Sequence, residues 1–326
     1  MNVTVVLCTC NRCSSLATAL DSVAAQILPR SVSWEVIVVD NNSTDQTSKV
    51  TEGYCRKYPG RFLYVFEPKQ GLSRARNAGI RAARGEIIAF LDDDVIADPG
   101  WLKNLVTHLH DGKWAGAGGR IVPPRDFTPP DWLTVGGEMD LLGALLPLFD
   151  LGEQAGEMKR PPYGTNMAFR KEMFDKYGMF RTDLGRCGNS LLMGEDTEFG
   201  NRLMLAGDCL WYEPLAVVEH PVPEERLSKK WFRAWWLGFG RTRILERTAR
   251  SPIFGIPYPF FSLANLVMRF LPMRTVRWVF TLDVRKRFYN YCQVWMTIGE
   301  IKQTSRMLIE RMSMNRRRPS QSIGQP

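Results

Sequence analysis

The chain has 326 residues, of which 44% are hydrophobic and 24% charged, and its formal net charge is +9. This composition excludes a disordered chain, and the length allows one large core with an appendage or two domains. Residues 226–326 contain 20 basic and 4 acidic side chains, a net charge of +16, so the preceding 225 residues carry −7. An acidic first part and a basic last part predict separate roles, and the basic part requires an anionic partner, either membrane lipid or nucleic acid.

The seven cysteines are irregularly spaced, and no secretion signal stands before them. We therefore expect a reducing, cytoplasmic compartment. Cys8, Cys10 and Cys13 lie close together, but a zinc site needs about four ligands and the sequence offers no second pair. These three cysteines are expected in a strand end and in the turn after it.

Apolar β-branched runs alternate with segments of helical spacing in the first 110 residues. The first run, VTVVLCT, is followed by apolar residues three or four positions apart, with Ser14 as the expected N-cap of a helix. Such alternation is typical of a parallel sheet covered by helices on both faces. We expect strands at 3–9, 34–40, 61–68 and 86–92, and helices at 14–26, after the turn 41–47, at 71–85 and at 99–110.

The alternation weakens after residue 112, where a Pro- and Gly-rich stretch, 125–160, is expected to form loops. The polar tail 312–326 is expected to be disordered. We expect a strand at 114–124 before the loop stretch and, after it, a strand leading into a helix at 164–180, a helix at 194–207 and a strand at 210–222.

Every predicted strand of the first part ends in polar residues. Ligands of such sheets bind beyond the carboxyl ends of the strands, so these groups are expected to meet in one crevice. The acidic run of Asp92, Asp93 and Asp94 is unusual, because adjacent carboxylates repel one another and resist desolvation. Mg²⁺ or Mn²⁺ bridging them to a diphosphate would offset that repulsion, and a solvated turn before the helix at 99 is the alternative.

Other polar residues fit the same crevice but have structural alternatives. Asp40 could form an Asx-turn, and a lone histidine such as His220 is more often structural than a ligand. Glu195 and Asp196 open a predicted helix, whose dipole favours acids at that end. Arg76, near another helix start, could bind phosphate or face solvent.

Two classes of nucleotide-binding protein are disfavoured because the sequence lacks their glycine-rich motifs. No G-x-G-x-x-G follows the strand 3–9, and no G-x-x-x-x-G-K-[ST] occurs, which argues against dinucleotide-dependent hydride transfer and P-loop hydrolysis. A nucleotidyltransferase of sugar phosphates is an enzyme alternative, although CTCNRCSS lacks the glycines of its usual N-terminal loop. An inactive glycan- or membrane-binding protein on the same scaffold is the other alternative.

Six blocks within residues 1–225 resemble, in sequence and order, the inverting glycosyltransferases of family 2. They are VTVVLCTCNR, WEVIVVDNNSTDQT, EPKQGLSRARNAGIRAARGEIIAFLDDDV, GTNMAFRKEMF, GEDTEFGNRLMLAG and VVEHPVPEER. The resemblance implies an α/β GT-A fold, Rossmann-like, with a mostly parallel central sheet flanked by helices. It implies Mn²⁺ or Mg²⁺, a nucleotide-sugar donor, with a UDP-sugar expected first, and a glycan or lipid-linked acceptor in polysaccharide or glycolipid biosynthesis.

The resemblance also implies roles for individual residues. Asp196 corresponds to the catalytic base, with Glu195 as its catalytic neighbour. Asp94 and His220 correspond to the metal ligands, and Asp93 is the alternative to Asp94. The residues implied in nucleotide-sugar binding are Thr9, Asn11, Arg12, Asp40 at the base, Asn42, Arg76, Asn77, Asp92 at the ribose, and Asp93.

These roles suit the chemistry of glycosyl transfer. Developing negative charge on a leaving diphosphate is stabilised by a metal, and an acceptor hydroxyl must lose its proton to a base as it attacks the sugar. Attack from the face opposite the diphosphate inverts the anomeric configuration, as in the direct displacement of inverting glycosidases. Retention of Asp40, Asp92, Asp94 and Asp196 argues against a decayed scaffold.

The last hundred residues match that family less well. The stretch 252–268 is uncharged but short and interrupted by three prolines, which argues against a membrane-spanning helix. Tryptophans interleaved with Arg and Lys fit an anionic membrane surface, and a packed helical subdomain with a basic exterior is the alternative. No recognised nucleic-acid motif accompanies the charge, so no nucleic acid is expected. We expect a domain at 1–225, a helical, basic, membrane-associating extension at 226–311, and peripheral attachment to the inner face of the cell membrane.

Overall fold

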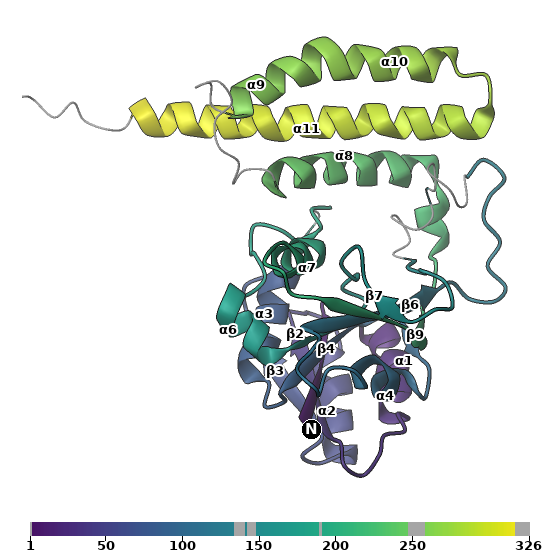
Figure 1. Ribbon diagram of the computed structural model, residues 1–326, viewed down its shortest axis with the longest axis vertical. Helices are drawn as coiled ribbons and strands as arrows, with labels where there is room; N and C mark the ends of the chain where they lie inside the picture. The colour runs from purple at the N-terminus through teal and green to yellow at the C-terminus, as the bar shows by residue number, and fades with distance from the viewer. Residues whose placement is uncertain (1, 134–140, 142–147, 189–190, 247–257, 317–326) are drawn as a thin grey trace, which may run out of the picture. The chain divides into compact units, whose positions relative to one another are not determined.

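The computed structural model describes residues 2–133, 141, 148–188, 191–246 and 258–316 (Figure 1). The chain divides into two compact units. The first comprises Met1–Pro130 and Val135–Leu227, and the second comprises Asp131–Thr134 and Ser228–Pro326.

The first unit is built on a nine-stranded sheet with the order β3-β2-β1-β4-β8-β6-β9-β5, in which β7 also pairs with β9. One half of the sheet is all parallel, as predicted from the alternation of strands and helices. Its strands are β1 (Asn2–Thr9), β2 (Ser33–Asp40), β3 (Phe62–Phe66) and β4 (Ile87–Asp92).

The other half of the sheet is mixed, because β8 runs antiparallel to both β4 and β6. The described residues of the expected loop region 125–160 include the short strand β7, and Phe149 forms an isolated bridge with Ile121 of β6. The strands of this half are β5 (Ile96–Ala97), β6 (Gly116–Val122), β7 (Gly156–Glu157), β8 (Asn166–Arg170) and β9 (Leu210–Glu219).

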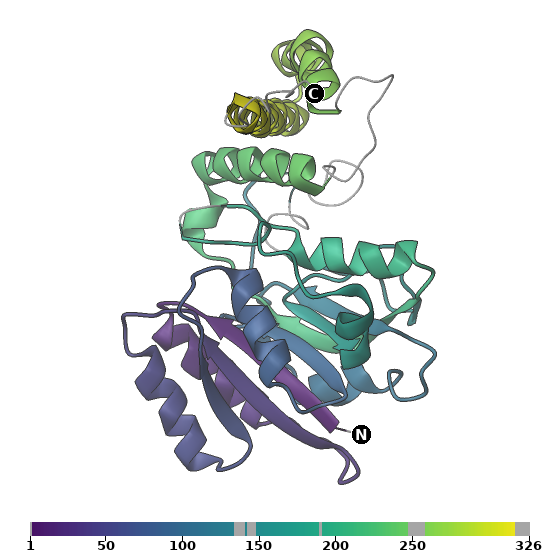
Figure 2. The same cartoon turned by 90° about the vertical axis from the view of Figure 1, so that its left-hand side faces the viewer.

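Helices lie on both faces of this sheet (Figures 1 and 2). α1 and α2 pack together on one face, while α3 packs on β1, β2 and β3. α4 is shorter than the helix predicted at 99–110, because the chain turns at Thr107. The helices are α1 (Cys13–Ala24), α2 (Thr47–Lys57), α3 (Leu72–Ala82), α4 (Trp101–Val106), α6 (Lys171–Tyr177) and α7 (Glu195–Leu205).

A cluster of aromatic side chains fixes α7 on the sheet. The rings of Phe174 and Phe199 stack with centroids 4.5 Å apart, and Phe90, Phe169 and Phe180 surround them. All five side chains are buried. Aromatic pairs of this kind add about 0.5–1.5 kcal/mol each beyond their area burial, so the start of α7 is held firmly over β4 and β8.

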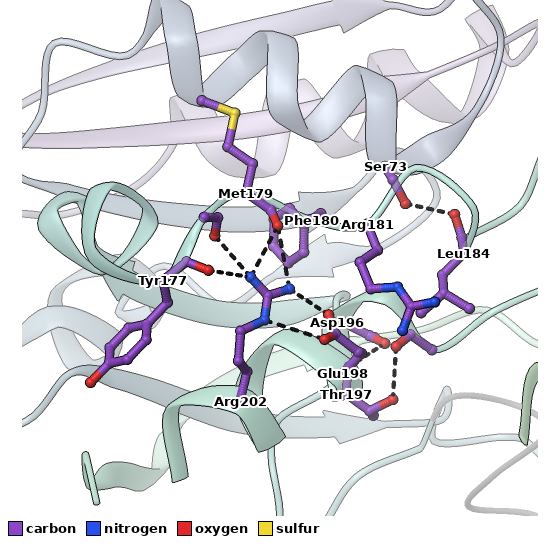
Figure 3. Close-up of polar contacts among 12 residues, drawn as sticks. Ser73, Tyr177, Met179, Phe180, Arg181, Leu184, Asp196, Thr197, Glu198 and Arg202 are labelled. Carbon is purple, nitrogen blue, oxygen red and sulfur yellow. Dashed lines mark hydrogen bonds and ion pairs between the residues drawn. The ribbon is translucent and has the colours of Figure 1, made fainter. Parts of the chain in front are cut away.

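Polar contacts tie the segment after α6 to α3 and α7 (Figure 3). Arg202 donates to the carbonyl oxygens of Tyr177 and Met179 at 2.6 and 3.3 Å and pairs with Glu198 one turn earlier in α7. From α3, Ser73 donates to the carbonyl of Leu184 at 2.7 Å. These bonds connect the segment 177–184 to α3 on one side and to α7 on the other.

The second unit is helical, as predicted for the region after residue 225. α11 lies between α8 and α10 (Figures 1 and 2). A Cβ at Gly240 would lie 2.0 Å from the Met296 carbonyl oxygen, and one at Gly299 would lie 2.1 Å from that of Leu237, so these glycines allow α8 and α11 to touch. The elements are α8 (Lys229–Glu246), α9 (Tyr258–Asn265), the π-turn η2 (Leu266–Phe270), α10 (Leu271–Phe280) and α11 (Val284–Arg316).

Two expectations for the second unit change in detail. α11 continues to Arg316, so the first five residues of the tail expected to be disordered, 312–316, are helical, and the rest of that tail lies outside the described residues. Within the stretch 252–268, residues 252–257 also lie outside them, and α9 begins at Tyr258. Across the described parts of the chain, no helix is both long and apolar enough to cross a membrane.

Candidate active site

The end of β4 and the end of β9 bring two carboxylates and a histidine together. One ligand atom from each of Asp92, Asp94 and His220 lies within 4.8 Å of the others. Asp92 is the last residue of β4, and the backbone N–H of His220, just beyond β9, donates to the carbonyl of Val122 at the end of β6 at 2.8 Å. The parallel pairing of β6 with β9 thus carries His220 to the predicted crevice.

His220 is oriented as a metal ligand would be. Its Nδ1 lies 2.7 Å from the carbonyl oxygen of Pro221, and because a carbonyl can only accept, Nδ1 carries the proton. The other ring nitrogen, Nε2, is then an acceptor and lies 3.7 Å from Asp94 Oδ1. A second hydrogen bond that fixes the tautomer is the usual companion of a histidine ligand. The cluster therefore fits a divalent cation.

Arginine side chains surround the same acids. Arg12 Nη1 lies 3.0 Å from Asp93 Oδ1 and 2.7 Å from Asp94 Oδ2. Arg226, in the 3₁₀ turn Glu224–Leu227, lies 3.9 Å from Asp94 Oδ2. Burial, together with the charge of nearby Arg186, lowers the pKa of Arg226. Cations crowded at the rim of an acidic site form a suitable setting for an anion as well as a metal.

Asp93 lies outside the three-residue cluster and pairs with Arg12. It is 5% exposed, and burial raises its pKa to about 6, while Arg12 opposes that shift. Of the two candidates for the predicted metal ligand, Asp94 is therefore the one that the geometry places beside His220.

A buried ion-pair chain links the first acid of the run to α7. Arg76 is 3% exposed; its Nη1 pairs with Glu195 Oε1 and its Nη2 lies 3.5 Å from Asp92 Oδ1. Thr165 donates to the other oxygen of Asp92 at 2.6 Å. Burial, followed by the charge of Asp196, raises the pKa of Glu195 to about 7. These two ion pairs hold Asp92 and the start of α7 in fixed positions relative to each other.

Asp196 is more accessible than Glu195 beside it. Its side chain is half-buried, whereas Glu195 is 4% exposed. Asp196 Oδ2 accepts the backbone N–H of Gly164 at 2.6 Å and Oδ1 accepts that of Thr197 at 2.7 Å (Figure 3). These two hydrogen bonds fix the orientation of the carboxylate at the start of α7.

Gly164 allows Arg76 to reach its two acids. A Cβ at this position would lie 2.2 Å from Arg76 Nη2, and the buried guanidinium has little room to retreat. We expect Gly164→Ala to lower the free energy of unfolding by about 1–3 kcal/mol, the range for overpacking. Urea denaturation measures this. Gly156→Ala is the control, because its Cβ would meet nothing within 4 Å; equal stability of the two variants would contradict the packing argument.

A second group of predicted residues gathers at the ends of β1 and β2. Thr9 and Asp40 are partners in the parallel register, and Asp40 accepts the Ser43 N–H and the Tyr64 hydroxyl, each at 2.9 Å. The bond to Ser43 is the Asx-turn considered as the alternative. Two strand spacings, about 10 Å, separate Asp40 on β2 from Asp92 on β4 across β1.

The loops after these strands are connected to each other. Asn11 Oδ1 accepts the backbone N–H of Thr44 at 2.7 Å, and the Asn11 N–H donates to Ser43 Oγ at 3.0 Å. Asn11 and Asn42 both have positive φ angles, 54° and 62°, which asparagine tolerates better than most residues. Both side chains are exposed at the rim.

Both the nitrogen and the oxygen of the Asn77 side-chain amide form hydrogen bonds with the backbone of one residue, Phe180. Its Nδ2 donates to the Phe180 carbonyl at 2.8 Å, and its Oδ1 accepts the Phe180 N–H at 3.0 Å. This buried pairing fixes the segment after α6 on α3. A direct nucleotide contact by Asn77, implied by the family resemblance, has no support in this geometry.

Comparison with known proteins identifies the family to which this site belongs. Residues 4–178 match the model of the family described as glycosyl transferase family 2, which is more than half of the chain. The chain belongs to glycosyl transferase family 2. The predicted membership and the predicted GT-A fold are both confirmed.

Curated relatives extend the similarity beyond the family model. The chain is 32% identical over 257 residues to the succinoglycan biosynthesis protein ExoM of Rhizobium meliloti, covering 77% of each chain. It is 28% identical over 257 residues to the glucosyl-dolichyl phosphate glucuronosyltransferase of Haloferax volcanii, covering 76% of this chain and 78% of that one.

Solved structures with the same fold include the mannosyltransferase PcManGT of Pyrobaculum calidifontis in complex with GDP-Man and Mn²⁺. That likeness has a TM-score of 0.61 at 20% identity and covers 92% of this chain and 86% of that one. GalNAc-T7 with UDP, GalNAc and Mn²⁺ has a TM-score of 0.53 at 18% identity, covering 78% of this chain and 52% of that one. These likenesses show the fold of this glycosyltransferase, and the Asp92–Asp94–His220 cluster is compatible with a divalent metal of the kind those two structures hold.

Several residues of this glycosyltransferase site were not singled out from the sequence. Arg226 follows His220 by six positions in the block VVEHPVPEER, and Thr165 follows Gly164 in GTNMAFRKEMF. Tyr64 lies in the interior of β3, and nothing in the sequence indicates that its hydroxyl group has a role in the site. Position within a family block was the available signal for the first two residues.

Proposed function

We propose that the chain is a metal-dependent, inverting glycosyltransferase that moves a sugar from a nucleoside-diphosphate sugar to a glycan or lipid-linked acceptor. A UDP-sugar is the expected donor. The observation that carries the proposal is the Asp92–Asp94–His220 cluster at the carboxyl edge of the sheet, with the half-buried Asp196 on the neighbouring helix.

Asp92, Asp94 and His220 would hold Mn²⁺ or Mg²⁺. Bound there, the cation would bridge to the diphosphate and neutralise the charge that develops on it as the glycosidic bond breaks. Arg12 and Arg226 stand next to the same acids and supply positive charge from the protein toward the same leaving group. The ion pair of Arg76 with Asp92 and Glu195 keeps the acid run in place.

The nucleoside would lie over β1 and β2. Asp40, fixed by Ser43 and Tyr64, is expected to contact the base, and Thr9, Asn11 and Asn42 line the same ends of the strands. The separation of about 10 Å between Asp40 and the acid run is about the length of a nucleoside, so the base and the diphosphate can reach both at once. Asn77 is expected to act by positioning Phe180.

Asp196 is proposed to remove the proton from the acceptor hydroxyl. Its two hydrogen bonds hold the carboxylate in one orientation at the start of α7, as a positioned base requires. Glu195 cannot serve directly, because it is buried against Arg76. Attack from the side of Asp196, opposite the diphosphate, would invert the anomeric carbon.

Polysaccharide or glycolipid biosynthesis is the proposed setting. The names of the two curated relatives refer to succinoglycan biosynthesis and to a glucosyl-dolichyl phosphate, which is a lipid-linked sugar. A lipid-linked acceptor would be met at a membrane, and the basic last hundred residues would favour its anionic inner face.

The proposal is tested by incubating the purified chain with a panel of nucleotide sugars and measuring release of the nucleoside diphosphate. Release is expected with one donor in Mn²⁺ or Mg²⁺, and its loss in EDTA should be reversed by added metal. The anomeric configuration of the transferred sugar, read by NMR, should be opposite to that of the donor. Full activity in EDTA, or a retained configuration, would overturn the corresponding part of the proposal.

A further inference from the structure

The helix α10 packs on α11 through one stripe of side chains. Arg274 Nη1 donates to Thr297 Oγ1 at 2.5 Å, and the ring of Trp278 lies 5.3 Å from that of Tyr291. These two residues of α10 are four positions apart and therefore share a face. All ten residues of α10 are described, and each is at least partly exposed, so the opposite face is open.

The open face of α10 is apolar. Val276 and Phe280, four positions apart, are 54% and 75% exposed, and Leu282 in the turn before α11 is 94% exposed. Contiguous exposed apolar side chains of this size on a soluble protein usually mark an interaction surface. We call the following residues the α10 surface: Val267, Met268, Met273, Val276, Val279, Phe280, Leu282 and Val284.

Positive charges are interleaved with the α10 surface. Arg269 in η2 and Arg277 in α10 are both exposed, and Arg277, three positions before Phe280, is its neighbour on the surface of α10. Asp283 is the only acidic residue of the sequence between 267 and 287, and its side chain accepts the backbone N–H of Lys286 at the start of α11. Three more exposed basic residues follow the turn: Arg285, Lys286 and Arg287.

We propose that the α10 surface docks onto an anionic lipid bilayer, with α10 lying in the plane of the interface. Large apolar side chains would enter the boundary between headgroups and acyl chains, while the flanking arginines and lysine would contact lipid phosphates. Among the described residues no helix is long and apolar enough to cross a membrane, so α10 would lie along the bilayer surface. A nucleic acid would match the cations but leave the apolar side chains exposed.

This inference deepens the proposed function by naming the surface that brings the enzyme to a lipid-linked acceptor. Only the purpose of membrane binding rests on the proposed function; the binding itself does not. Vesicle binding needs neither donor nor acceptor, whereas diphosphate release from a donor sugar needs no vesicle. Failure of one measurement therefore leaves the other intact.

Flotation of the full chain with lipid vesicles tests the proposal. We expect the protein to float with vesicles of equal parts phosphatidylglycerol and phosphatidylcholine at 50 mM NaCl. Floating should decrease at 500 mM NaCl, where screening is strong, and should be weak with phosphatidylcholine alone. Wild-type protein that stays at the bottom with anionic vesicles would overturn the proposal.

Two double variants assign the binding to the α10 surface. Val276→Ser with Phe280→Ser removes apolar area and should weaken vesicle binding by about tenfold or more. Arg269→Gln with Arg277→Gln removes two charges and should weaken binding to anionic vesicles by about 30-fold. Ile309→Ser is the matched control, because Ile309 is 67% exposed on α11 outside the α10 surface, and it should bind as wild type.

Further outcomes exclude other occupants of the α10 surface. All variants should elute as wild type in gel filtration and melt at similar temperatures, since every substituted side chain is exposed. Wild-type vesicle binding by both double variants would place the membrane contact elsewhere and overturn the proposal. A concentration-dependent dimer that Val276→Ser with Phe280→Ser abolishes would identify the α10 surface as a contact between copies and overturn it as well.

Discussion

Asp196→Asn is expected to reduce the rate of sugar transfer by about 10²–10⁴-fold, the usual contribution of a positioned general base. Asparagine keeps an oxygen to accept the backbone N–H of Gly164 but cannot take up the acceptor proton. Donor affinity should stay near the wild-type value, because Asp196 lies outside the Asp92–Asp94–His220 cluster. Single-turnover transfer and nucleotide titration measure the two effects separately.

Glu198→Gln is the matched control for Asp196→Asn. It removes a carboxylate from the same turn of α7, and glutamine can still accept a hydrogen bond from Arg202. We expect transfer close to the wild-type rate. If Asp196→Asn transferred sugar as fast as this control while binding donor normally, the base would have to be another group.

The buried half of the fold is readable from the sequence for a simple reason. Strands such as IIAFLD are apolar on both faces only in a parallel sheet that is covered twice, so β1, β2 and β4 follow directly from their residues. Glu67 and Asp92 mark where apolar runs stop. The antiparallel entry of β8 is less readable, because NMAFR has the same buried pattern in either direction.

The candidate site was partly predictable, because strand ends converge on one edge of such a sheet. That rule brings Asp92, Asp94 and His220 to one place, although His220 lies far from the two acids in the sequence. It does not tell which way a side chain turns. Asp93 toward Arg12 and Glu195 toward Arg76 are outcomes of packing between segments about 80 and 120 residues apart, and local pattern carries no information about them.

The same limit explains the residues that sequence reasoning missed. Arg226 reaches Asp94 because the chain turns back after β9, and the turn at Glu224–Leu227 has no strong local signature. In the second unit, basic and aromatic composition indicated an interfacial region, but the contacts of Arg274 and Trp278 with α11 show which face of α10 remains open. Composition thus predicts a partner, and packing selects the surface.

Asp94→Asn is expected to abolish metal binding at the concentrations that saturate the wild-type protein. The substitution replaces one of the three clustered ligands, Asp94, by an uncharged side chain. Even the loss of a hydrogen-bond partner behind a metal ligand typically lowers metal affinity by about 10–100-fold, so the loss of a ligand should lower it at least as much. Wild-type protein should melt at a higher temperature in Mn²⁺, since ligand at 100 times its Kd stabilises by about 2.7 kcal/mol. Asp94→Asn should show no such increase, and its rate of sugar transfer should fall in parallel.

Asp93→Asn separates this ligand role from the general charge of the acidic run. Both substitutions remove one negative charge, and both acids pair with Arg12, so effects through that arginine should be alike. Asp93 lies outside the cluster formed by Asp92, Asp94 and His220, so Asp93→Asn should keep the Mn²⁺-dependent rise in melting temperature. Retention of the rise in Asp94→Asn and its loss in Asp93→Asn would reverse the assignment of the two acids. Loss in both would mean that total negative charge, and not the geometry of one carboxylate, governs metal affinity.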